Sequence, residues 1–300
     1  SVKQFRAIVA KVGCAIVAPS ATIAPADQRL YAVRDVTGTV RSLDLITSSI
    51  LSKKLAAGLQ ALVLDVKTGS GAVMQDLQEA IVLAHALVKT ANGAGCPTSA
   101  LITDMNQPLL PSIGNAVEVA DVMRAFESAN GGMVDVAIEL GTQLLVQAHF
   151  FHTEKGARDQ MIKTLTDGSA KVKFGEMVAA QKGPANFADR WEDYLTIAPS
   201  NEVLATDDGY IQEIDGTALG QIVVELGGGR QREDDQIDHS VGLSEIAPLG
   251  KKMKKGQPIA LLHCSEKTIG PKITKAVQNA IVLGAEAPTL RPLILERIAP

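Results

Sequence analysis

The chain has 300 residues, a net charge of -4 and 46% hydrophobic residues, as in a folded protein with one large or two medium domains. The slight acidic excess excludes a basic surface for nucleic acid or an anionic membrane, and no apolar run is long enough to cross a bilayer. Only 3% of the residues are aromatic, so we expect an Ala, Val, Leu and Ile core typical of α/β proteins, in the cytoplasm.

The first elements predicted are a helix and a strand. The stretch "QFRAIVAKVG" has amphipathic spacing and ends at Gly13, and the short apolar run "CAIVA" predicts a buried strand. These elements resemble the middle of a fold with no targeting segment before them, so we expect the chain to be a piece of a longer polypeptide. Cys14, Cys96 and Cys264 lack the spacing of disulfide or zinc sites, which predicts buried or part-buried thiols.

The chain continues with two helices and then an α/β pattern. One helix begins near Asp27, and "LDLITSSILSKKLAAG" forms a second that ends at Gly58. The run "LQALVLDV" does not alternate, as expected of a parallel strand covered on both faces. A helix to about Ala91, the strand "TSALITDM" and the helix "GNAVEVADVMRAFESA" follow, which predicts a parallel sheet with right-handed crossovers.

Residues 133–181 read as mostly helical, and the pattern changes after residue 200. The runs "NEVLATDDGYIQEID", "GQIVVELGGGRQ" and "GQPIALLHC" predict short strands, and a helix in "KTIGPKITKAVQNAIVLG" follows them. The predicted fold class is α/β, with a mixed, mainly parallel sheet, a portion of a small helical domain and a C-terminal α+β barrel-like appendage. We place part of the α/β domain at 1–20, part of the helical domain at 21–58, the α/β domain at 59–199 and the C-terminal domain at 200–300.

The loop "DVKTGSGAVM", residues 65–74, permits two interpretations. A glycine-rich turn between a strand and a helix points backbone N–H groups at one place, where a phosphate could bind. The loop matches neither the P-loop nor the dinucleotide spacing of glycines, however. The alternative is a tight turn in which Gly69 and Gly71 allow close packing.

A binding site could also form from three residues that precede this loop in the sequence. Ser49 and Lys53 lie four residues apart in a predicted helix and share a face, while Lys54 points elsewhere. Arg34, in the preceding helix, converges with them if the two helices form a hairpin. Such a donor-only group would suit carbonyl oxygens that become more negative in a reaction. The alternative is that Arg34 pairs with a nearby aspartate and Lys53 is a solvated surface charge.

Several long motifs then resemble the thymidine phosphorylases and related pyrimidine-nucleoside phosphorylases across essentially the whole chain. They are "IAPADQRLYAVRDVTGTV", "SLDLITSSILSKKLAAGLQALVLDVKTGSGAVM", "LITDMNQPL", "GNAVEV" and "GGGRQREDDQIDHSVG". Val73 departs from the Phe usual in the family, which we interpret as a change in core packing.

The resemblance implies a homodimeric enzyme with two domains that close over a cleft. Its reaction would be reversible phosphorolysis of thymidine or deoxyuridine to the free base and 2-deoxyribose 1-phosphate, in pyrimidine salvage. Arg34, Ser49 and Lys53 fall at the family's pyrimidine-binding positions and would be both substrate-binding and catalytic. Phosphate is a co-substrate, and no organic cofactor is implied.

The resemblance also implies a phosphate-binding Lys-His-Ser-Thr-Gly-Gly type loop in a segment before residue 1. We therefore assign no phosphate-binding residue in this chain, interpret "KTGSGAVM" as a structural turn that borders the cleft, and expect residues 1–300 alone to be inactive or nearly so. Some family members hold a structural monovalent cation, for which Asp121 is the matching acid and Glu118 the neighbouring alternative.

Other chemistry is less well supported by the sequence. The five histidines form no metal-binding array, although His149 and His152 are spaced to share a helix face. Two other readings stay open. One is a biotinyl or lipoyl carrier domain, suggested by the lysines around Met253, and the other is a non-catalytic fragment.

Overall fold

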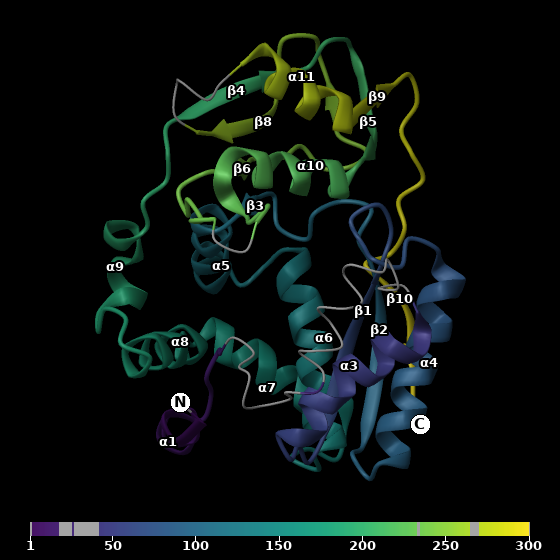
Figure 1. Cartoon of the computed structure of the whole chain (residues 1–300), viewed down its shortest axis with the longest axis vertical. Helices are drawn as coiled ribbons and strands as arrows, with labels where there is room; N and C mark the ends of the chain where they lie inside the picture. Colours follow the sequence, from purple (N-terminus) through teal and green to yellow (C-terminus); the bar gives the residue numbers. More distant parts are fainter. Residues whose placement is uncertain (1, 18–25, 27–41, 233–234, 265–269, 300) are drawn as a thin grey trace.

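The computed structural model describes residues 2–17, 26, 42–232, 235–264 and 270–299 (Figure 1). Three strands and a set of helices make up most of its first two-thirds. These elements are α1 (Val2–Val12), α3 (Leu43–Ala56), β1 (Leu62–Thr68), α4 (Leu77–Gly93), β2 (Thr98–Asp104), β3 (Ile113–Gly114), α5 (Ala116–Ser128), α6 (Gly132–Gln147), α7 (Glu154–Thr166), α8 (Ser169–Ala180) and α9 (Phe187–Tyr194).

Short strands dominate the C-terminal part, by which we mean residues 200–284. Its elements, with the last strand of the chain, are β4 (Ser200–Leu204), β5 (Gly209–Ile214), α10 (Gly216–Val223), the π-helical turn η1 (Val224–Gly228), β6 (Gly242–Ser244), β7 (Lys252–Met253), β8 (Pro258–His263), α11 (Pro271–Ala280), β9 (Ile281–Gly284) and β10 (Ile294–Ile298).

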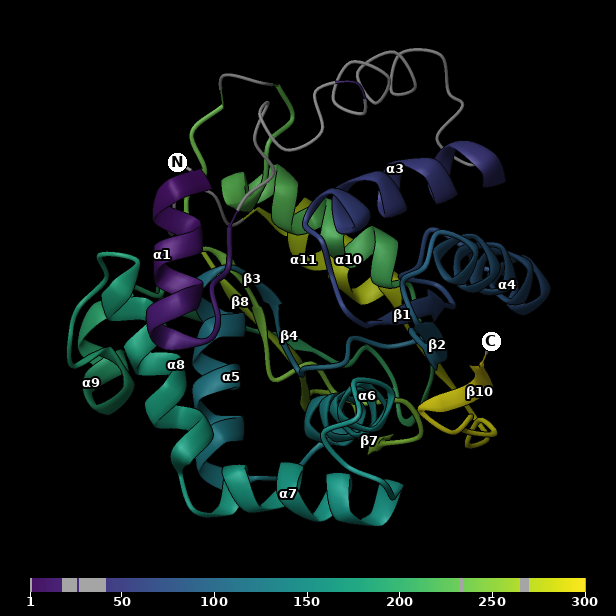
Figure 2. The ribbon, with the colours of Figure 1, turned by 90° about the horizontal axis from the view of Figure 1, so that it is seen from below.

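A three-stranded sheet in the order β1-β2-β10 organises the α/β part. The strands β1 and β2 are parallel, with Leu62 opposite Thr98 and Thr68 opposite Asp104, as the sequence predicts. Helix α4 covers one face and α6 the other (Figure 2). Asp76 caps α4 by accepting hydrogen bonds from the backbone N–H groups of Gln78 and Glu79, which explains why the helix begins there. The β1–β2 crossover therefore forms the scaffold on which α3 and the glycine loop lie.

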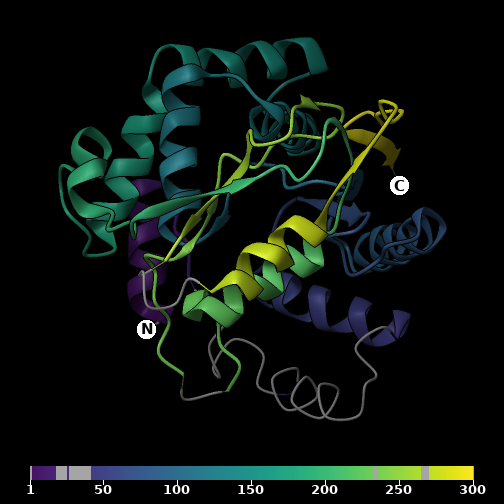
Figure 3. The ribbon, with the colours of Figure 1, turned by 90° about the horizontal axis from the view of Figure 1, so that it is seen from above.

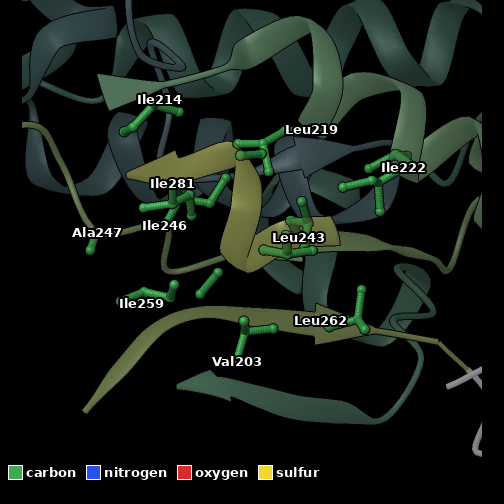
Figure 4. Packing of buried hydrophobic residues seen from close by; sticks show 14 of the residues in the cluster. Val203, Ile214, Leu219, Ile222, Leu243, Ile246, Ala247, Ile259, Leu262 and Ile281 are labelled. Carbon is green, nitrogen blue, oxygen red and sulfur yellow. The ribbon is translucent and has the colours of Figure 1, made fainter. Parts of the chain in front are cut away.

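The C-terminal part forms two small antiparallel sheets, ordered β3-β6-β8-β4 and β7-β5-β9, the first of which gains β3 from the earlier part of the chain. Their inner faces meet in an apolar core, in which Leu219, Leu243, Ile259 and Leu262 are fully buried (Figure 4). Helices α10 and α11 lie side by side against this core (Figure 3). This region is therefore stabilised mainly by burial of aliphatic side chains.

The remaining helices pack beside the sheet. α5, α8 and α9 share a small cluster that includes Met123, Phe187 and Trp191, and α1 lies against α8 (Figure 2). Within the described residues, no helix combines the length and apolar character needed to span a bilayer.

Two predictions from the sequence are wrong. Residues 14–17 are not a buried strand but an irregular segment, in which Ile16 is 68% exposed and exchanges two hydrogen bonds with the Gln181 side chain. Residues 216–228 are helical, although "GQIVVELGGGRQ" reads as a strand. Asp215 accepts a hydrogen bond from the N–H of Ala218 and starts the helix, and apolar residues such as Leu219 and Ile222 recur at helical spacing towards the core.

The final strand adds a feature that the sequence does not predict. β10 leaves the C-terminal part and returns to pair antiparallel with β2, where Ile298 lies opposite Ala100. The sheet is therefore mixed, as predicted, but with one parallel pair and one antiparallel pair it is not mainly parallel.

Candidate active site

Helix α3 carries two of the three predicted site residues. It follows Ser42 and is succeeded by Gly58, whose positive φ of 72° stops the helix at the predicted place. Ser49 is 7% exposed, and Lys53 Nζ donates a hydrogen bond to Ser49 Oγ over 3.1 Å. The prediction that these side chains share a face is confirmed. Because Lys53 Nζ occupies an acceptor position of Ser49, the serine O–H can donate to a ligand.

Arg34 lies outside the described residues. Its convergence with Ser49 and Lys53 therefore stays a prediction. Asp44, a candidate partner for Arg34 in the alternative interpretation, lies in the first turn of α3, where an acidic side chain suits the positive end of the helix dipole.

Ser49 opens into a pocket of about 300 Å³ between α3, β1 and α4. The pocket is mostly apolar. Its lining residues are Ile46, Ser49 and Ile50 of α3, Leu64, Asp65, Val66 and Lys67 of β1, Val73 and Met74 of the glycine loop, and Leu83 and Leu87 of α4. A flat, mainly apolar ring with polar atoms on its edge matches such a space, because its faces can lie on aliphatic side chains.

Val73 was assigned to the core on the sequence evidence, and that assignment is wrong. Its side chain is 61% exposed near the end of the glycine loop and lines the pocket. The physical reason is that the loop turns back at Gly69, whose φ is 122°, and carries Val73 outward beside the entrance. A Val at this position therefore bears on the shape of the pocket.

The glycine loop, residues 69–74, uses three of its backbone N–H groups inside the protein. Ser70 N–H donates to the Asn106 side chain at 3.2 Å, Gly71 N–H to the Met105 carbonyl at 3.0 Å and Ala72 N–H to the Gly69 carbonyl at 3.0 Å. Amides that already have acceptors are not available to cradle a phosphate. The geometry therefore supports the tight-turn interpretation.

A polar group at the pocket rim was missed in the sequence. Lys67 Nζ lies 2.6 Å from Asp65 Oδ2 and donates to Thr103 Oγ1 at 2.9 Å, and Thr103 Oγ1 donates to Asp65 Oδ1 at 2.5 Å. The three side chains form a closed triangle on neighbouring strands, since Lys67 is in register with Thr103. The only signal in the sequence was two charged residues in an otherwise apolar strand.

The residues considered for a cation lie on α5. Asp121 Oδ1 pairs with Arg124 at 2.7 Å, while its buried Oδ2 has no hydrogen-bond partner among the described residues. Burial raises the pKa of Glu118 above its ordinary value; a hydrogen bond from Gly114 N–H opposes this, and the Asp121 charge adds to it. Within the described residues, no three His, Cys, Asp or Glu side chains form a metal-binding group.

The two closely spaced histidines do not share a helix face. His149 follows the end of α6 with a positive φ of 61°, and His152 lies in the bend before α7. Gly227, inside the π-helical turn, has a positive φ of 96° and gives the chain a tight turn there. All three cysteines are free, and Cys96 and Cys264 are buried as expected.

The carrier-domain alternative finds no support at Met253. Its side chain is 2% exposed and belongs to the core, and Lys252 lies over the Tyr210 ring with 5.6 Å between Nζ and the ring centroid. These residues sit in β7, paired with β5, rather than at the tip of an exposed hairpin.

Comparisons with known proteins agree with this geometry. Residues 1–171 match the family model described as "Glycosyl transferase family, a/b domain", and residues 210–284 match "Pyrimidine nucleoside phosphorylase C-terminal domain". The chain is 47% identical to the thymidine phosphorylase of Sinorhizobium medicae, over 99% of this chain and 69% of the relative. It is 46% identical to that of Rhizobium meliloti and 44% identical to that of Sinorhizobium fredii, over 99% of this chain and 68% and 69% of those proteins. The chain belongs to the family of thymidine and pyrimidine-nucleoside phosphorylases.

Proposed function

We propose that the protein containing this sequence catalyses the reversible phosphorolysis of thymidine to thymine and 2-deoxyribose 1-phosphate, a pentosyl transfer in pyrimidine salvage. The observation that carries the proposal is the Ser49–Lys53 pair at an apolar pocket in a member of this family. The relatives named thymidine phosphorylase support it.

The chemistry follows from where charge develops. The bond between C1′ of the sugar and N1 of the base breaks with its electron pair on the base, and a phosphate oxygen forms the new bond to C1′. The departing pyrimidine anion gathers negative charge on its carbonyl oxygens, which the Lys53 ammonium and the Ser49 hydroxyl can stabilise. Arg34 is proposed as the third donor. The base then takes up a proton at N1, and no covalent enzyme intermediate is required.

The apolar walls favour thymine as the base. Ile46 and Ile50 on α3 and Val73 on the glycine loop offer aliphatic surface beside Ser49. A base held at its oxygens by Ser49 and Lys53 would place its ring and its C5 methyl group against such surface, and burying a methyl group contributes about 0.8 kcal/mol. Deoxyuridine, which lacks the methyl group, would bind by the same donors with lower affinity.

Thymine release tests this proposal directly. Purified protein containing this sequence is mixed with thymidine, with and without phosphate, and thymine and 2-deoxyribose 1-phosphate are quantified by chromatography. We expect equal amounts of the two products only when phosphate is present. Release of thymine with free deoxyribose, independent of phosphate, would indicate hydrolysis and contradict the proposal.

Four further properties stay proposals. We propose a homodimer that acts in the cytoplasm, with light scattering on the purified protein as the test of the oligomeric state. Within one chain, the apolar residues Ile46, Ile50 and Leu51 of α3 already pack on the core, so the apolar side of this helix does not by itself support a dimer contact. We also retain the predicted domain boundaries and the barrel-like form of the C-terminal domain as proposals.

A structural monovalent cation at Asp121 is also proposed. Its buried Oδ2 without a hydrogen-bond partner among the described residues fits a cation ligand, because such an oxygen gains from a positive partner. When bound, the ion would stabilise the first half of α5 and take no part in bond breaking. Replacing potassium by a bulky organic cation in the buffer should lower the melting temperature if the ion binds there.

A further inference from the structure

Ser70 connects the glycine loop to the C-terminal part of the molecule. Its hydroxyl donates to the Ile214 carbonyl at 2.5 Å and accepts from the Gly216 N–H at 3.4 Å, and its carbonyl accepts from Thr217 Oγ1 at 2.7 Å. Its N–H donates to Asn106 Oδ1. Every polar group of this residue therefore has a partner, and three of the four contacts come from the junction of β5 and α10.

The backbones of the two regions also touch at this point. A Cβ atom placed on Gly216 would lie 2.9 Å from Gly71 Cα, a distance that real Cβ atoms do not show. The first turn of α10, capped by Asp215, is therefore seated directly on the loop. Contact this close transmits a shift of α10 to the loop, because packed backbones have little room to adapt separately.

The opposite side of the same loop faces the pyrimidine pocket. Val73 lies three residues after Ser70 and lines the pocket, as does Met74. The loop is closed at its base by a bridge between Thr68 and Met74 and by a hydrogen bond from Thr68 Oγ1 to the Gln75 carbonyl at 3.2 Å. In a segment this short and closed at its base, a shift of Ser70 also moves Val73, which lies three residues further along the loop.

We propose that Ser70 is a positioning residue for the pyrimidine pocket. Through Ser70, the C-terminal part holds the glycine loop in place and thereby sets where the Val73 side chain meets the base. The inference rests on the proposed function. It assigns to the C-terminal part an effect on base binding, although that part supplies none of the residues that line the pocket.

Two variants remove the connection from opposite sides. Ser70→Ala removes the hydroxyl from the loop, and Thr217→Val removes the donor from α10. Loss of a hydrogen bond of this kind should raise the KM for thymidine roughly two- to tenfold. The KM for phosphate should stay within about twofold, because the glycine-loop amides already bond within the protein. Thr217→Ser, which keeps the donor, should restore the wild-type KM.

Hydrogen exchange provides a readout independent of activity. The amides of residues 70–74 should exchange faster in Ser70→Ala and Thr217→Val than in the wild type, while amides of α4 exchange at unchanged rates. Matched controls are Ser169→Ala and Thr166→Val, which alter exposed residues that bond only within the α7–α8 region. The controls should leave both KM values and loop exchange unchanged.

Two results would overturn the proposal. Wild-type thymidine KM and wild-type loop exchange in both variants would show that Ser70 does not hold the loop. A parallel rise in both KM values with faster exchange throughout the protein would show a general loss of stability instead. If the wild type releases no thymine, the proposed function fails and with it the effect on KM, whereas the exchange rates still decide whether Ser70 holds the loop.

Discussion

The two walls of the proposed pyrimidine pocket are built in opposite ways. Helix α3 is a regular element that presents Ser49 and Lys53 by helical spacing, so its contribution lies in its side chains. The glycine loop is held by its backbone, with Gly69 pressed against Asn106 and its amides bonded inside the protein. The difference teaches that substitutions on the helix wall should alter chemistry, whereas substitutions in the loop should first alter the fold.

The largest expected effect is on stability, in Gly69→Ala. The φ of Gly69 is 122°, and a Cβ atom there would lie 2.7 Å from the backbone N of Asn106. We expect a loss of about 3 kcal/mol or more in unfolding free energy, from backbone strain together with the clash. Urea unfolding measures this loss.

Gly95→Ala is the matched control for that loss. Gly95 also has a positive φ, 82°, but no atom lies within 4 Å of the added Cβ. Gly95→Ala should therefore lower the unfolding free energy only by the backbone strain, about 1–2 kcal/mol. Equal losses of unfolding free energy in the two variants would contradict the idea that crowding around Gly69 adds to the strain.

Lys53→Ala tests the helix wall. The variant should unfold like the wild type within about 0.5 kcal/mol but lower kcat/KM for thymidine roughly tenfold to a thousandfold, since it removes one donor to the departing base. Steady-state thymine release measures the change. Lys54→Ala, one residue further along the helix and exposed, should retain wild-type kcat/KM; a matching loss there would show that the charge acts only at long range.

Ser49→Ala should have a smaller effect than Lys53→Ala. It removes a neutral hydroxyl donor and the partner of Lys53, which predicts a decrease in kcat/KM of about tenfold. Ser52→Ala, on the same helix with its hydroxyl bonded to the Ser49 carbonyl, serves as the comparison and should have little effect. An unchanged kcat/KM in Ser49→Ala would mean that the pocket does not bind the base at this hydroxyl.

Val73→Phe tests the contribution of the glycine loop to the pocket, and we expect the smallest effect from this variant. Because the side chain is 61% exposed, the change in stability should stay within about 0.5 kcal/mol. A larger ring beside the pocket should change the KM for thymidine about two- to fivefold and alter the ratio of activities on thymidine and deoxyuridine. Val172→Phe, equally exposed on α8, is the control and should leave the ratio as it is.

Local patterns account for most of what could be predicted from the sequence. Ser49 and Lys53 share a face because a spacing of four is a property of any helix. The strands β1 and β2 and the helix between them follow from their apolar runs and from the start of α4 at Asp76. These features depend on neighbours within a few residues, so one sequence is enough to find them.

The errors have a nonlocal cause. The triangle of Asp65, Lys67 and Thr103 depends on the register between two strands. The outward direction of Val73 depends on how the loop packs against Met105 and Asn106. The β-branched residues at 222–224 suggested a strand, but burial against α11 favours the helix. In each case tertiary contacts outweigh the local signal.

The return of β10 to the first sheet has a consequence for how the protein is made. Its pairing with β2 joins segments almost two hundred residues apart, for example Ile298 and Ala100. A contact of such high sequence separation forms late, since the intervening loop entropy must be offset first. During synthesis, the edge of β2 that later pairs with β10 therefore stays unpaired until residue 298 has left the ribosome. This interval is when the chain is most exposed to strand pairing with other nascent chains and most in need of a chaperone.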